Sequence, residues 1–323
     1  MTYAVGIVGT GQPGDPGPDG FAMAYEHAEG YRGVDDCELV ACADIVPENA
    51  ERFAAEFDLP ASAVYDSHAA MLDAEDLDIV SVTVPPAAHA DITIDCAKAG
   101  VRAVHCEKPM ADTFGDARLM AQECARRDVQ LTFNHHRRFG APFRRARELV
   151  EEGAIGDLRR VEFAASNLCD YGTHSFELSN YLAGEATPAW VLAGLDYREE
   201  NRWFGMHNEN QAVALWAYEN GVHGLATTGE PGEDAVGCHN RVLGTEGTIE
   251  LGYGGETALR VRRAGEADWE TIDTGEEGLH GSTYHHRAIA DLVACLDADR
   301  DPEQRAERAL AATELVFGAW ESA

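Results

Sequence analysis

Near its start the chain reads Tyr3-Ala4-Val5-Gly6-Ile7-Val8, an apolar run that leads directly into the turn Gly9-Thr10-Gly11-Gln12-Pro13-Gly14. The run predicts a β-strand, and the turn has the G-x-G-x-x-G spacing. Glycines are needed there because the backbone must turn tightly and approach a pyrophosphate held at a helix N-terminus. For the hexapeptide alone, a glycine-rich turn without a ligand is the alternative. Two prolines in the following segment, Asp15 to Gly20, disfavour a helix there, so we expect the phosphate-facing helix to begin near Gly20.

Strand and helix patterns alternate over the first 135 residues. Short apolar runs are followed by stretches with apolar residues at helical spacing, which predicts a doubly wound parallel sheet. The expected strands are 3–8, 38–43, 79–84, 103–106 and 130–134, and the expected helices include 47–57, 89–99 and 114–127. Residues 1–135 are therefore predicted to form a Rossmann dinucleotide-binding domain.

The pattern changes after residue 135. A helix is expected over 142–152 and a strand over 158–166, and residues 190–272 read mainly as antiparallel strands with a hairpin turn at Asn220-Gly221. Two helices follow, over 282–296 and 302–320, the second entered through Asp301-Pro302. The predicted fold class is therefore α/β plus α+β, with residues 136–323 as a substrate-binding and oligomerisation domain around a broad, mainly antiparallel open sheet. A broad sheet with one face not covered by helices favours a homodimer or homotetramer.

The second expected strand ends at Ala43-Asp44-Ile45. A carboxylate at this position can accept hydrogen bonds from both hydroxyls of an adenosine ribose. No arginine lies between Ile45 and Glu51 to receive a 2′-phosphate, so the sequence favours NAD over NADP as the cofactor.

The charge of the chain excludes several classes of partner. Its 323 residues include 25 basic and 57 acidic side chains, a net charge of 25 − 57 = −32. Such a field repels a phosphate backbone and anionic membrane surfaces, and no basic cluster with interleaved aromatic residues is present. We expect no nucleic-acid partner, no membrane partner, no membrane span and no signal peptide.

Of the 25 basic residues only two are lysines, Lys98 and Lys108. An acidic, lysine-poor composition fits a protein kept soluble in concentrated salt, where the Debye length is a few Å. We expect a salt-adapted, haloarchaeal-type protein of a high-salt cytosol, with an ordinary acidic protein as the alternative. The eight cysteines contain no C-x-x-C pair and indicate buried reduced thiols, and no set of His, Cys, Asp and Glu has metal-ligand spacing, so no metal is expected.

Two further turns follow expected strands, Thr83 to His89 and Cys106 to Pro109. Both stand at the carboxyl ends of parallel strands, where ligands bind in open α/β sheets. With these turns the chain resembles the Gfo/Idh/MocA oxidoreductases, the glucose-fructose oxidoreductase and inositol dehydrogenase family. In chain order the matching pieces are the P-x-x-x-H turn Pro85 to His89, the E-K-P motif Glu107 to Pro109, the N-x-x-R-R-F crossover Asn134 to Phe139, the G-T-E-G turn Gly244 to Gly247 and the closing helix.

The family's second catalytic motif, D-x-G-x-H, is similar to Asp170 to His174, with Glu177 in place of a later Asp. If Gly172 begins a helix, His174 lies in its first turn and Asp170 just before it. Oxidation of a secondary alcohol needs a group that takes the hydroxyl proton while the hydride leaves for nicotinamide. The resemblance implies that Lys108, Asp170 and His174 are catalytic, with His174 as the base, Lys108 polarising the hydroxyl or relaying its proton, and Asp170 orienting the substrate or the lysine. Whether Lys108 or His174 is the principal base stays open.

The resemblance implies an NAD(P)-dependent dehydrogenase that acts on a CH–OH group of a sugar, a polyol or a related hydroxy compound. The plainer interpretations are a solvated strand-end lysine for Lys108, an interface histidine for His174 and a helix cap for Asp170. The co-occurrence of all these motifs in one chain favours catalysis. The expected cofactor contacts are Gly9, Thr10, Gly11, Gln12, Gly14, Asp44, Pro85, His89, Glu107 and Lys108, and the expected substrate contacts are Arg138, Tyr171 and His285.

Other functions stay open at this stage. The fold could hold NAD tightly and recycle it within the site, or use it in a redox-assisted elimination. A non-catalytic member would bind a dinucleotide or a metabolite as a sensor. Biliverdin-reductase-like chemistry is less favoured because it does not need the Asp170 and His174 pair. The loop with Trp203, Phe204, His207 and Asn208 fits a contact with sugar hydroxyls and a subunit contact equally well.

Overall fold

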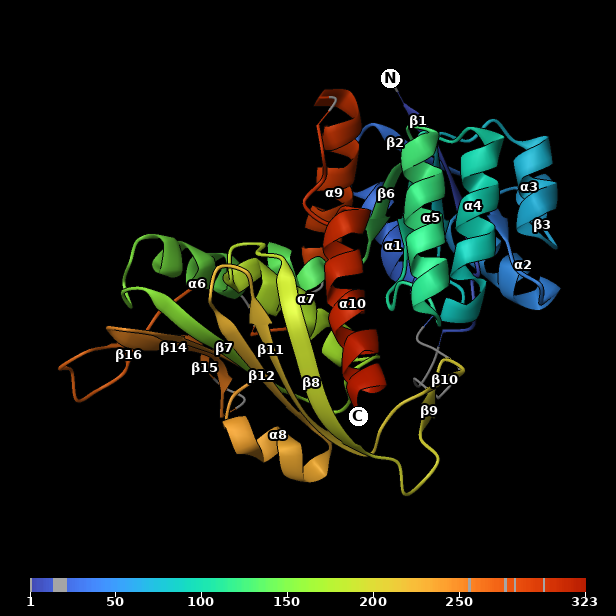
Figure 1. Cartoon of the computed structure of the whole chain (residues 1–323). Helices are drawn as coiled ribbons and strands as arrows, with labels where there is room; N and C mark the ends of the chain where they lie inside the picture. The colour runs from blue at the N-terminus through green and yellow to red at the C-terminus, as the bar shows by residue number, and fades with distance from the viewer. Residues whose placement is uncertain (1, 14–21, 255–256, 276–277, 282, 299) are drawn as a thin grey trace. The chain divides into compact units, whose positions relative to one another are not determined.

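The computed structural model describes residues 2–13, 22–254, 257–275, 278–281, 283–298 and 300–323 (Figure 1). The chain forms two compact units, each built from several segments. The first unit comprises Met1–Asn134, Arg202–Met206 and His285–Leu310, and the second comprises His135–Asn201, His207–Tyr284 and Ala311–Ala323. Most of helix α9 (Thr283–Ala298) thus belongs to the first unit, although a division at residue 135 places it in the second. The division into contiguous domains stays a prediction.

The first unit is built on a six-stranded parallel sheet with the order β3-β2-β1-β4-β5-β6. This is the strand order of a dinucleotide-binding Rossmann fold, which confirms the predicted doubly wound sheet. The two-residue β3 is too short to leave a sequence pattern. The strands are β1 (Tyr3–Val8), β2 (Cys37–Ala43), β3 (Val64–Tyr65), β4 (Ile79–Val82), β5 (Ala103–Cys106) and β6 (Gln130–Phe133).

Helices cover both faces of the Rossmann sheet. On one face α3 (His68–Ala74), α4 (His89–Ala99) and α5 (Phe114–Arg126) pack beside one another (Figure 1). On the other face α1 (Ala24–Arg32), α2 (Pro47–Glu56) and α9 bury a second apolar cluster. Because both faces are buried, the parallel strands are nearly continuous apolar runs, and this is why the sequence revealed them.

The second unit is built on an eight-stranded sheet with the order β16-β15-β14-β13-β7-β12-β11-β8. The neighbouring strands run antiparallel except β7 and β12, which are parallel. This confirms the predicted broad, mainly antiparallel sheet. Its strands are β7 (Leu158–Ala165), β8 (Pro188–Asp196), β11 (Gln211–Tyr218), β12 (His223–Thr228), β13 (Asn240–Gly244), β14 (Gly247–Tyr253), β15 (Thr257–Arg263) and β16 (Glu270–Thr271).

The two faces of this second sheet differ. Helices α6 (Ala141–Glu151) and α7 (Gly172–Leu182) lie over one face, and the short α8 (Glu230–Val236) lies over the other (Figure 1). Beyond α8 that second face is open, since Leu192 of β8 and Leu215 of β11 are direct cross-strand neighbours and are 57% and 43% exposed.

The same face carries charged residues on its other strands. Glu162 of β7, Arg241 of β13, Glu250 of β14 and Arg260 of β15 are successive cross-strand neighbours. Arg241 forms ion pairs with Glu162 at 3.2 Å and with Glu250 at 2.8 Å, and Arg260 pairs with Glu250. One half of the face is therefore apolar and the other half is an ion-pair ladder.

The remaining strands are β9 (Arg202–Trp203) and β10 (Met206–His207), the last helix is α10 (Ala306–Ser322), and single 3-10 turns are formed by Ala61–Ala63, Pro86–Ala88 and His136–Phe139. α10 begins four residues later than the sequence predicts, because Gln304 and Arg305 pair with the edge strand β6 instead of starting the helix. Phe133 N donates to the Gln304 carbonyl at 3.0 Å, and Arg305 forms a bridge with Thr132. All eight cysteines are free thiols and seven are buried, as predicted. No helix in the described ranges combines the length and the apolar character needed to cross a membrane.

Candidate active site

The glycine turn after β1 is fixed at the carboxyl end of the Rossmann sheet. Gly9 N donates to the Ala43 carbonyl at 2.8 Å, and Thr83 Oγ1 lies 2.8 Å from the Gly9 carbonyl oxygen. Gly9 has a φ of +87°, and a Cβ there would lie 2.4 Å from Val84 Cγ1. Only glycine fits this position, because the φ is positive and a side chain would collide with Val84. Gln12 is exposed on the turn, whereas Gly14 and the Asp15 to Gly20 insertion lie outside the described residues.

Asp44 follows β2 and is tied to the same turn. Its Oδ2 accepts hydrogen bonds from the Thr10 hydroxyl at 3.0 Å and the Gly11 N–H at 2.9 Å, and its Oδ1 accepts one from the Val46 N–H at 2.8 Å. Both lone pairs of Oδ2 are thus used, and Oδ1 has one left, so Asp44 can still accept one ribose hydroxyl at Oδ1. The neighbouring Ile45 side chain is 89% exposed and offers an apolar surface that the sequence did not single out.

Glu107 follows β5 and is the centre of a buried hydrogen-bond network in the first unit. Its Oε1 accepts from His27 Nε2 at 2.9 Å and from Asn134 Nδ2 at 2.6 Å, and its Oε2 accepts from the Lys108 backbone N–H at 3.1 Å. Burial raises the pKa of Glu107. The hydrogen bond from His27, the charge of Lys108 and the hydrogen bond from Asn134 together lower this pKa by more than burial raises it, so it is held well below its usual value. Glu107 is therefore an ionised group that fixes the backbone at Lys108.

The network extends to two more elements. His27 of α1 places Nδ1 2.6 Å from Ser81 Oγ on β4, and Asn134 Nδ2 lies 3.1 Å from His285 Nδ1 on α9. Burial lowers the pKa of His285 to about 4, so its neutral ring accepts the Asn134 N–H. The E-K-P and N-x-x-R-R-F motifs therefore meet at the hydrogen bond from Asn134 to Glu107. No sequence pattern indicated His27, which lies 80 residues from Glu107.

His89 begins α4 and joins the P-x-x-x-H turn to the E-K-P turn. Its Nε2 lies 2.8 Å from the Val84 carbonyl oxygen and its Nδ1 lies 3.0 Å from the Pro109 carbonyl oxygen. The ring is fully buried, and burial lowers its pKa, so the neutral ring donates to one of these oxygens. His89 therefore holds the two turns together rather than presenting an atom to a cofactor, whereas Pro85 is exposed on its turn.

Lys108 is partly buried, and its side chain contacts an aromatic ring. Its Nζ lies 5.7 Å from the centre of the Phe204 ring, within the range of a cation–π interaction. Phe204 belongs to the loop between β9 and β10 that the sequence could not rank. In the first unit, this loop contributes a contact to the candidate catalytic lysine.

The turn that carries Asp170 and His174 lies in the second unit. α7 begins at Gly172, so His174 lies in its first turn and Asp170 immediately precedes it, as the spacing predicts. Tyr171 N donates to Asn167 Oδ1 at 3.0 Å. A Cβ at Gly172 would lie 2.4 Å from the Asn167 carbonyl oxygen, so the glycine of the motif is needed for the turn to close.

Asn208 and Glu209 hold this turn from a separate segment. Asp170 N donates to Asn208 Oδ1 at 3.3 Å. Glu209 is fully buried, and its Oε1 accepts from Leu168 N at 2.6 Å and from Thr228 Oγ1 at 2.9 Å. From the sequence, two roles stayed open for the loop with Asn208, a contact with sugar hydroxyls and a subunit contact, and Glu209 was missed. Together they fix the backbone that presents Asp170.

Three histidine rings meet in the second unit. The His174 side chain is 5% exposed and packs edge-on against His135 and His136, with ring centres 5.6 and 5.1 Å away. His135 Nε2 lies 3.4 Å from Thr173 Oγ1. The histidines of the crossover therefore set the orientation of the candidate base.

Arg138 is not placed to bind a substrate, contrary to the sequence-based interpretation. Its side chain is fully buried and forms ion pairs with Glu177 at 2.5 Å and Glu185 at 2.7 Å, and its guanidinium lies 4.8 Å from the centre of the Tyr181 ring. With no exposed surface and two carboxylate partners, Arg138 stabilises the packing of α7. The sequence could not show which of two adjacent arginines is paired.

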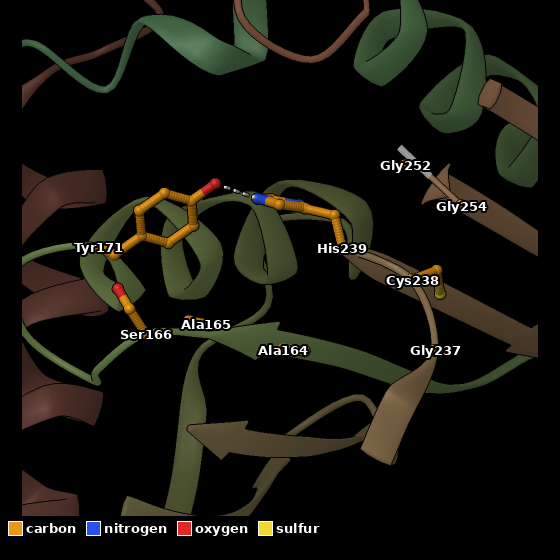
Figure 2. Close-up of a pocket in the computed structure, with 9 residues that line it drawn as sticks. All are labelled: Ala164, Ala165, Ser166, Tyr171, Gly237, Cys238, His239, Gly252 and Gly254. Carbon is orange, nitrogen blue, oxygen red and sulfur yellow. Dashed lines mark hydrogen bonds between the residues drawn. The ribbon is translucent and has the colours of Figure 1, made fainter. Parts of the chain in front are cut away.

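A pocket of about 430 Å³ lies beside Tyr171 in the second unit (Figure 2). Figure 2 labels the nine lining residues, which include Ser166, Tyr171 and His239. The Tyr171 hydroxyl and His239 Nε2 lie 3.1 Å apart. Arg137 contacts both side chains, with its guanidinium 4.3 Å from the Tyr171 ring centre and its Nη1 3.0 Å from His239 Nε2. Of this group the sequence indicated only Tyr171. Among the described residues, no group of three His, Cys, Asp or Glu side chains is arranged to hold a metal ion.

This chain is similar to known proteins in sequence and in fold. A family model described as an oxidoreductase family with an NAD-binding Rossmann fold, GFO_IDH_MocA, matches residues 3–135. Inositol 2-dehydrogenase 3 of Saccharopolyspora erythraea is 33% identical over 292 residues, which cover 84% of this chain and 80% of that protein. D-apiose dehydrogenase of Paraburkholderia graminis is 28% identical over 251 residues, which are 71% of this chain, and the chain spans 64% of that relative's length.

A solved structure shows a similar fold. The oxidoreductase from Agrobacterium radiobacter in complex with NAD+, L-tartaric acid and magnesium superimposes with a TM-score of 0.81 over 100% of this chain and 96% of that chain. The two chains are 18% identical, so this similarity concerns the fold.

Proposed function

Because the chain belongs to the Gfo/Idh/MocA family of oxidoreductases, we propose that it is an NAD-dependent dehydrogenase that oxidises a CH–OH group of a sugar, a polyol or a related hydroxy compound. The observation that carries the proposal is the fixed position of Lys108, whose backbone is bound by the ionised Glu107 at the end of β5. The glycine turn after β1 lies at the same edge of the parallel sheet, where dinucleotides bind.

The residues of the first unit fit NAD. Gly9, Thr10, Gly11 and Gln12 would hold the pyrophosphate, and Asp44 would accept one adenosine ribose hydroxyl. A 2′-phosphate beside the Asp44 carboxylate would be repelled, which favours NAD over NADP. When bound, NAD supplies the carbon that accepts the hydride. Gly14 and Pro85 are proposed contacts as well, whereas the buried His89 and Glu107 support the turns that make the contacts.

The proton chemistry is assigned to three side chains. His174 takes the proton of the substrate hydroxyl as the hydride leaves the same carbon, so that the C–OH group becomes a carbonyl. Lys108 donates a hydrogen bond to the reacting oxygen or relays its proton, and Asp170 orients the substrate or the lysine. The alcohol thus loses one hydride and one proton, and the products are the carbonyl compound, NADH and H+. Tyr171 and His285 are proposed substrate contacts.

The test is NADH formation by the purified protein. A panel of sugars, polyols and sugar acids is offered with NAD in molar KCl, and the ultraviolet absorbance of NADH is followed. At least one compound should be oxidised. Tight NAD binding without turnover of any compound would favour a non-catalytic dinucleotide-binding protein, and NAD that copurifies and never exchanges would favour an enzyme that recycles its cofactor.

We also propose that the protein works in a high-salt cytosol, as haloarchaeal proteins do. The net charge of −32 and the use of arginine for all but two basic residues support this. The melting temperature should rise between about 0.1 M and about 1 M KCl, as the Debye length falls from about 10 to about 3 Å and the repulsion between carboxylates is screened. A melting temperature that does not change with KCl would indicate an ordinary acidic protein.

Finally, we propose a homodimer or homotetramer that uses the open face of the second sheet. Trp190, Leu192, Val213 and Leu215 are exposed there by between 43% and 57%, and adjacent exposed apolar residues of this kind favour an interface. Light scattering should give a multiple of the 35.0 kDa chain mass for the native protein. Leu215→Glu should shift the mass toward that of a single chain, and a native protein with the mass of one chain would contradict the proposal.

A further inference from the structure

We propose that the substrate of this enzyme carries a carboxylate, and that Arg137 binds this carboxylate at the pocket beside Tyr171 and His239. The inference rests on the proposed function and narrows it from sugars and polyols in general to hydroxy acids such as sugar acids.

Arg137 is a buried cation without a carboxylate partner in contact. Its side chain is 5% exposed, and no Asp or Glu among the described residues forms an ion pair with it. Asp170 is near enough for its charge to favour the charged guanidinium, but it forms no ion pair with Arg137. The next residue, Arg138, is equally buried and has two glutamate partners, at 2.5 and 2.7 Å. Because burying an unpaired cation is costly, this difference between adjacent arginines indicates that a ligand supplies the missing anion.

The hydrogen bonds of Arg137 leave donor capacity for that anion. Its Nη1 donates to His239 Nε2 at 3.0 Å, which is the one hydrogen bond that the guanidinium makes within the described part of the chain, and its Nε is buried without a partner, as is that of Arg138. His239 donates its Nδ1–H to Asn240 Oδ1, so its Nε2 is an acceptor. Burial and the charge of Arg137 lower the pKa of His239 to about 3, so the ring is neutral and does not compensate the guanidinium charge.

The pocket fits a small anion in a protein whose overall field repels one. Its volume of about 430 Å³ lies within the roughly 300–1,000 Å³ usual for small-molecule sites. Arg137 is not itself a lining residue, but it contacts two lining side chains, Tyr171 and His239, whose polar atoms point toward each other (Figure 2). None of the nine lining residues is acidic, although the chain has 57 acidic side chains. Because a net charge of −32 repels anions, an anionic substrate can bind only where a local cation is present and acidic side chains are absent.

The test compares matched acids and neutral compounds, D-gluconate with D-glucitol and D-galacturonate with D-galactose. Calorimetric Kd and kcat/KM for NADH formation are measured at one KCl concentration. At least one acid should be preferred over its neutral partner by about ten- to hundredfold, the range of one charge-assisted interaction. Arg137→Gln should remove the preference for the acid. Arg137→Lys should keep part of this preference, because lysine retains the positive charge but cannot donate the two parallel hydrogen bonds of a guanidinium. Arg159→Gln, a change at a residue of β7 that is 64% exposed, makes the same change in net charge and should keep the preference.

The outcomes separate the two proposals. Turnover of the neutral compounds without any preference for the acids would overturn the carboxylate site and leave the dehydrogenase in place. Binding of an acid, lost in Arg137→Gln, without turnover of any compound would keep the carboxylate site and overturn the dehydrogenase. Binding of neither acid, or a preference that survives in Arg137→Gln, would overturn the inference. If Arg137→Gln does not fold, the native preference and the Arg137→Lys variant decide.

Discussion

The two candidate catalytic segments are held in place by different means. In the first unit, Lys108 lies just beyond β5 of the parallel sheet, and Glu107, the residue between them, is buried and binds the Lys108 backbone N–H. In the second unit, Asp170 and His174 stand on either side of a turn that needs Gly172. Asn208 holds that turn from a segment 38 residues away. The sheet thus fixes the first segment, and tertiary hydrogen bonds fix the second. We therefore expect the first segment to be most sensitive to substitutions that remove a reacting or charged side chain, and the second to substitutions that distort its backbone turn.

The largest expected effect is that of Lys108→Ala on turnover. If Lys108 polarises the hydroxyl or relays its proton, its loss should lower kcat by about 10²- to 10⁴-fold while NADH binding, followed by fluorescence, is retained. Lys98→Ala is the matched control, because the only other lysine is an exposed residue of α4 paired with Asp95. Full activity of Lys108→Ala would show that Lys108 takes no part in the reaction.

A smaller effect is expected when the support of Lys108 is removed. Glu107→Gln keeps the shape of the side chain and loses the charge that His27 and Lys108 face, and breaking such a buried arrangement should lower the free energy of unfolding by about 3 kcal/mol in urea denaturation. Since the pKa of Glu107 is held below its usual value, its stabilisation is present above about pH 4.3 and is lost as the pH falls through the folded-state pKa.

The control for this variant is Glu29→Gln in α1 of the same unit. Glu29 is 55% exposed in a surface ion pair, so its replacement should change the stability by less than about 0.5 kcal/mol. Equal effects of the two substitutions would mean that the buried network does not hold the E-K-P turn.

In the second unit the corresponding variant is Gly172→Ala. One methyl group there would meet the Asn167 carbonyl oxygen at 2.4 Å, so we expect a loss of about 1–3 kcal/mol and a lower kcat from displacement of His174. Gly194→Ala in β8 adds the same methyl group where no atom lies within 4 Å and should be neutral in both measurements. Normal stability and turnover of Gly172→Ala would show that the turn before α7 does not require glycine at this position.

The same contrast explains what could be predicted from the sequence. In the first unit, the candidate functional residues lie just after apolar strands, so local patterns located Asp44 and Lys108, and the alternation of strands and helices predicted the doubly wound sheet. The support of Lys108 was not visible, because nothing in the pattern of α1 shows that His27 reaches a carboxylate 80 residues away.

In the second unit, the spacing predicted where Asp170 and His174 lie relative to the start of α7, but it did not indicate the pocket. Arg137 and His239 are 102 residues apart and meet only because the crossover and β13 are brought together by the fold. For the same reason the sequence assigned a substrate role to Arg138, since the glutamates that pair with it lie on α7 and in the turn after it.

The smallest effect is expected from pH, and it compares one partly buried histidine in each unit. Burial and Arg137 lower the pKa of His239 to about 3, and burial lowers that of His285 to about 4, whereas an unfolded histidine has a pKa of about 6.5. Below about pH 6.5 the unfolded chain therefore binds a proton at each position that the folded chain does not, so stability is complete above that pH and falls as the pH decreases. Because both side chains are partly exposed, we expect a loss of about 1 kcal/mol for each between pH 7.5 and about 5.5.

The readout of this prediction is the slope of unfolding free energy against pH at fixed KCl. His239→Gln and His285→Gln should each reduce the slope, whereas His223→Gln, at an exposed residue of β12, should leave it unchanged. Four of the five tryptophans belong to the second unit, so fluorescence should register the His239→Gln change more strongly than the His285→Gln change. Identical slopes for all three variants and the native protein would show that neither histidine is held neutral, and the pocket beside Arg137 would then contain a second cation in acid.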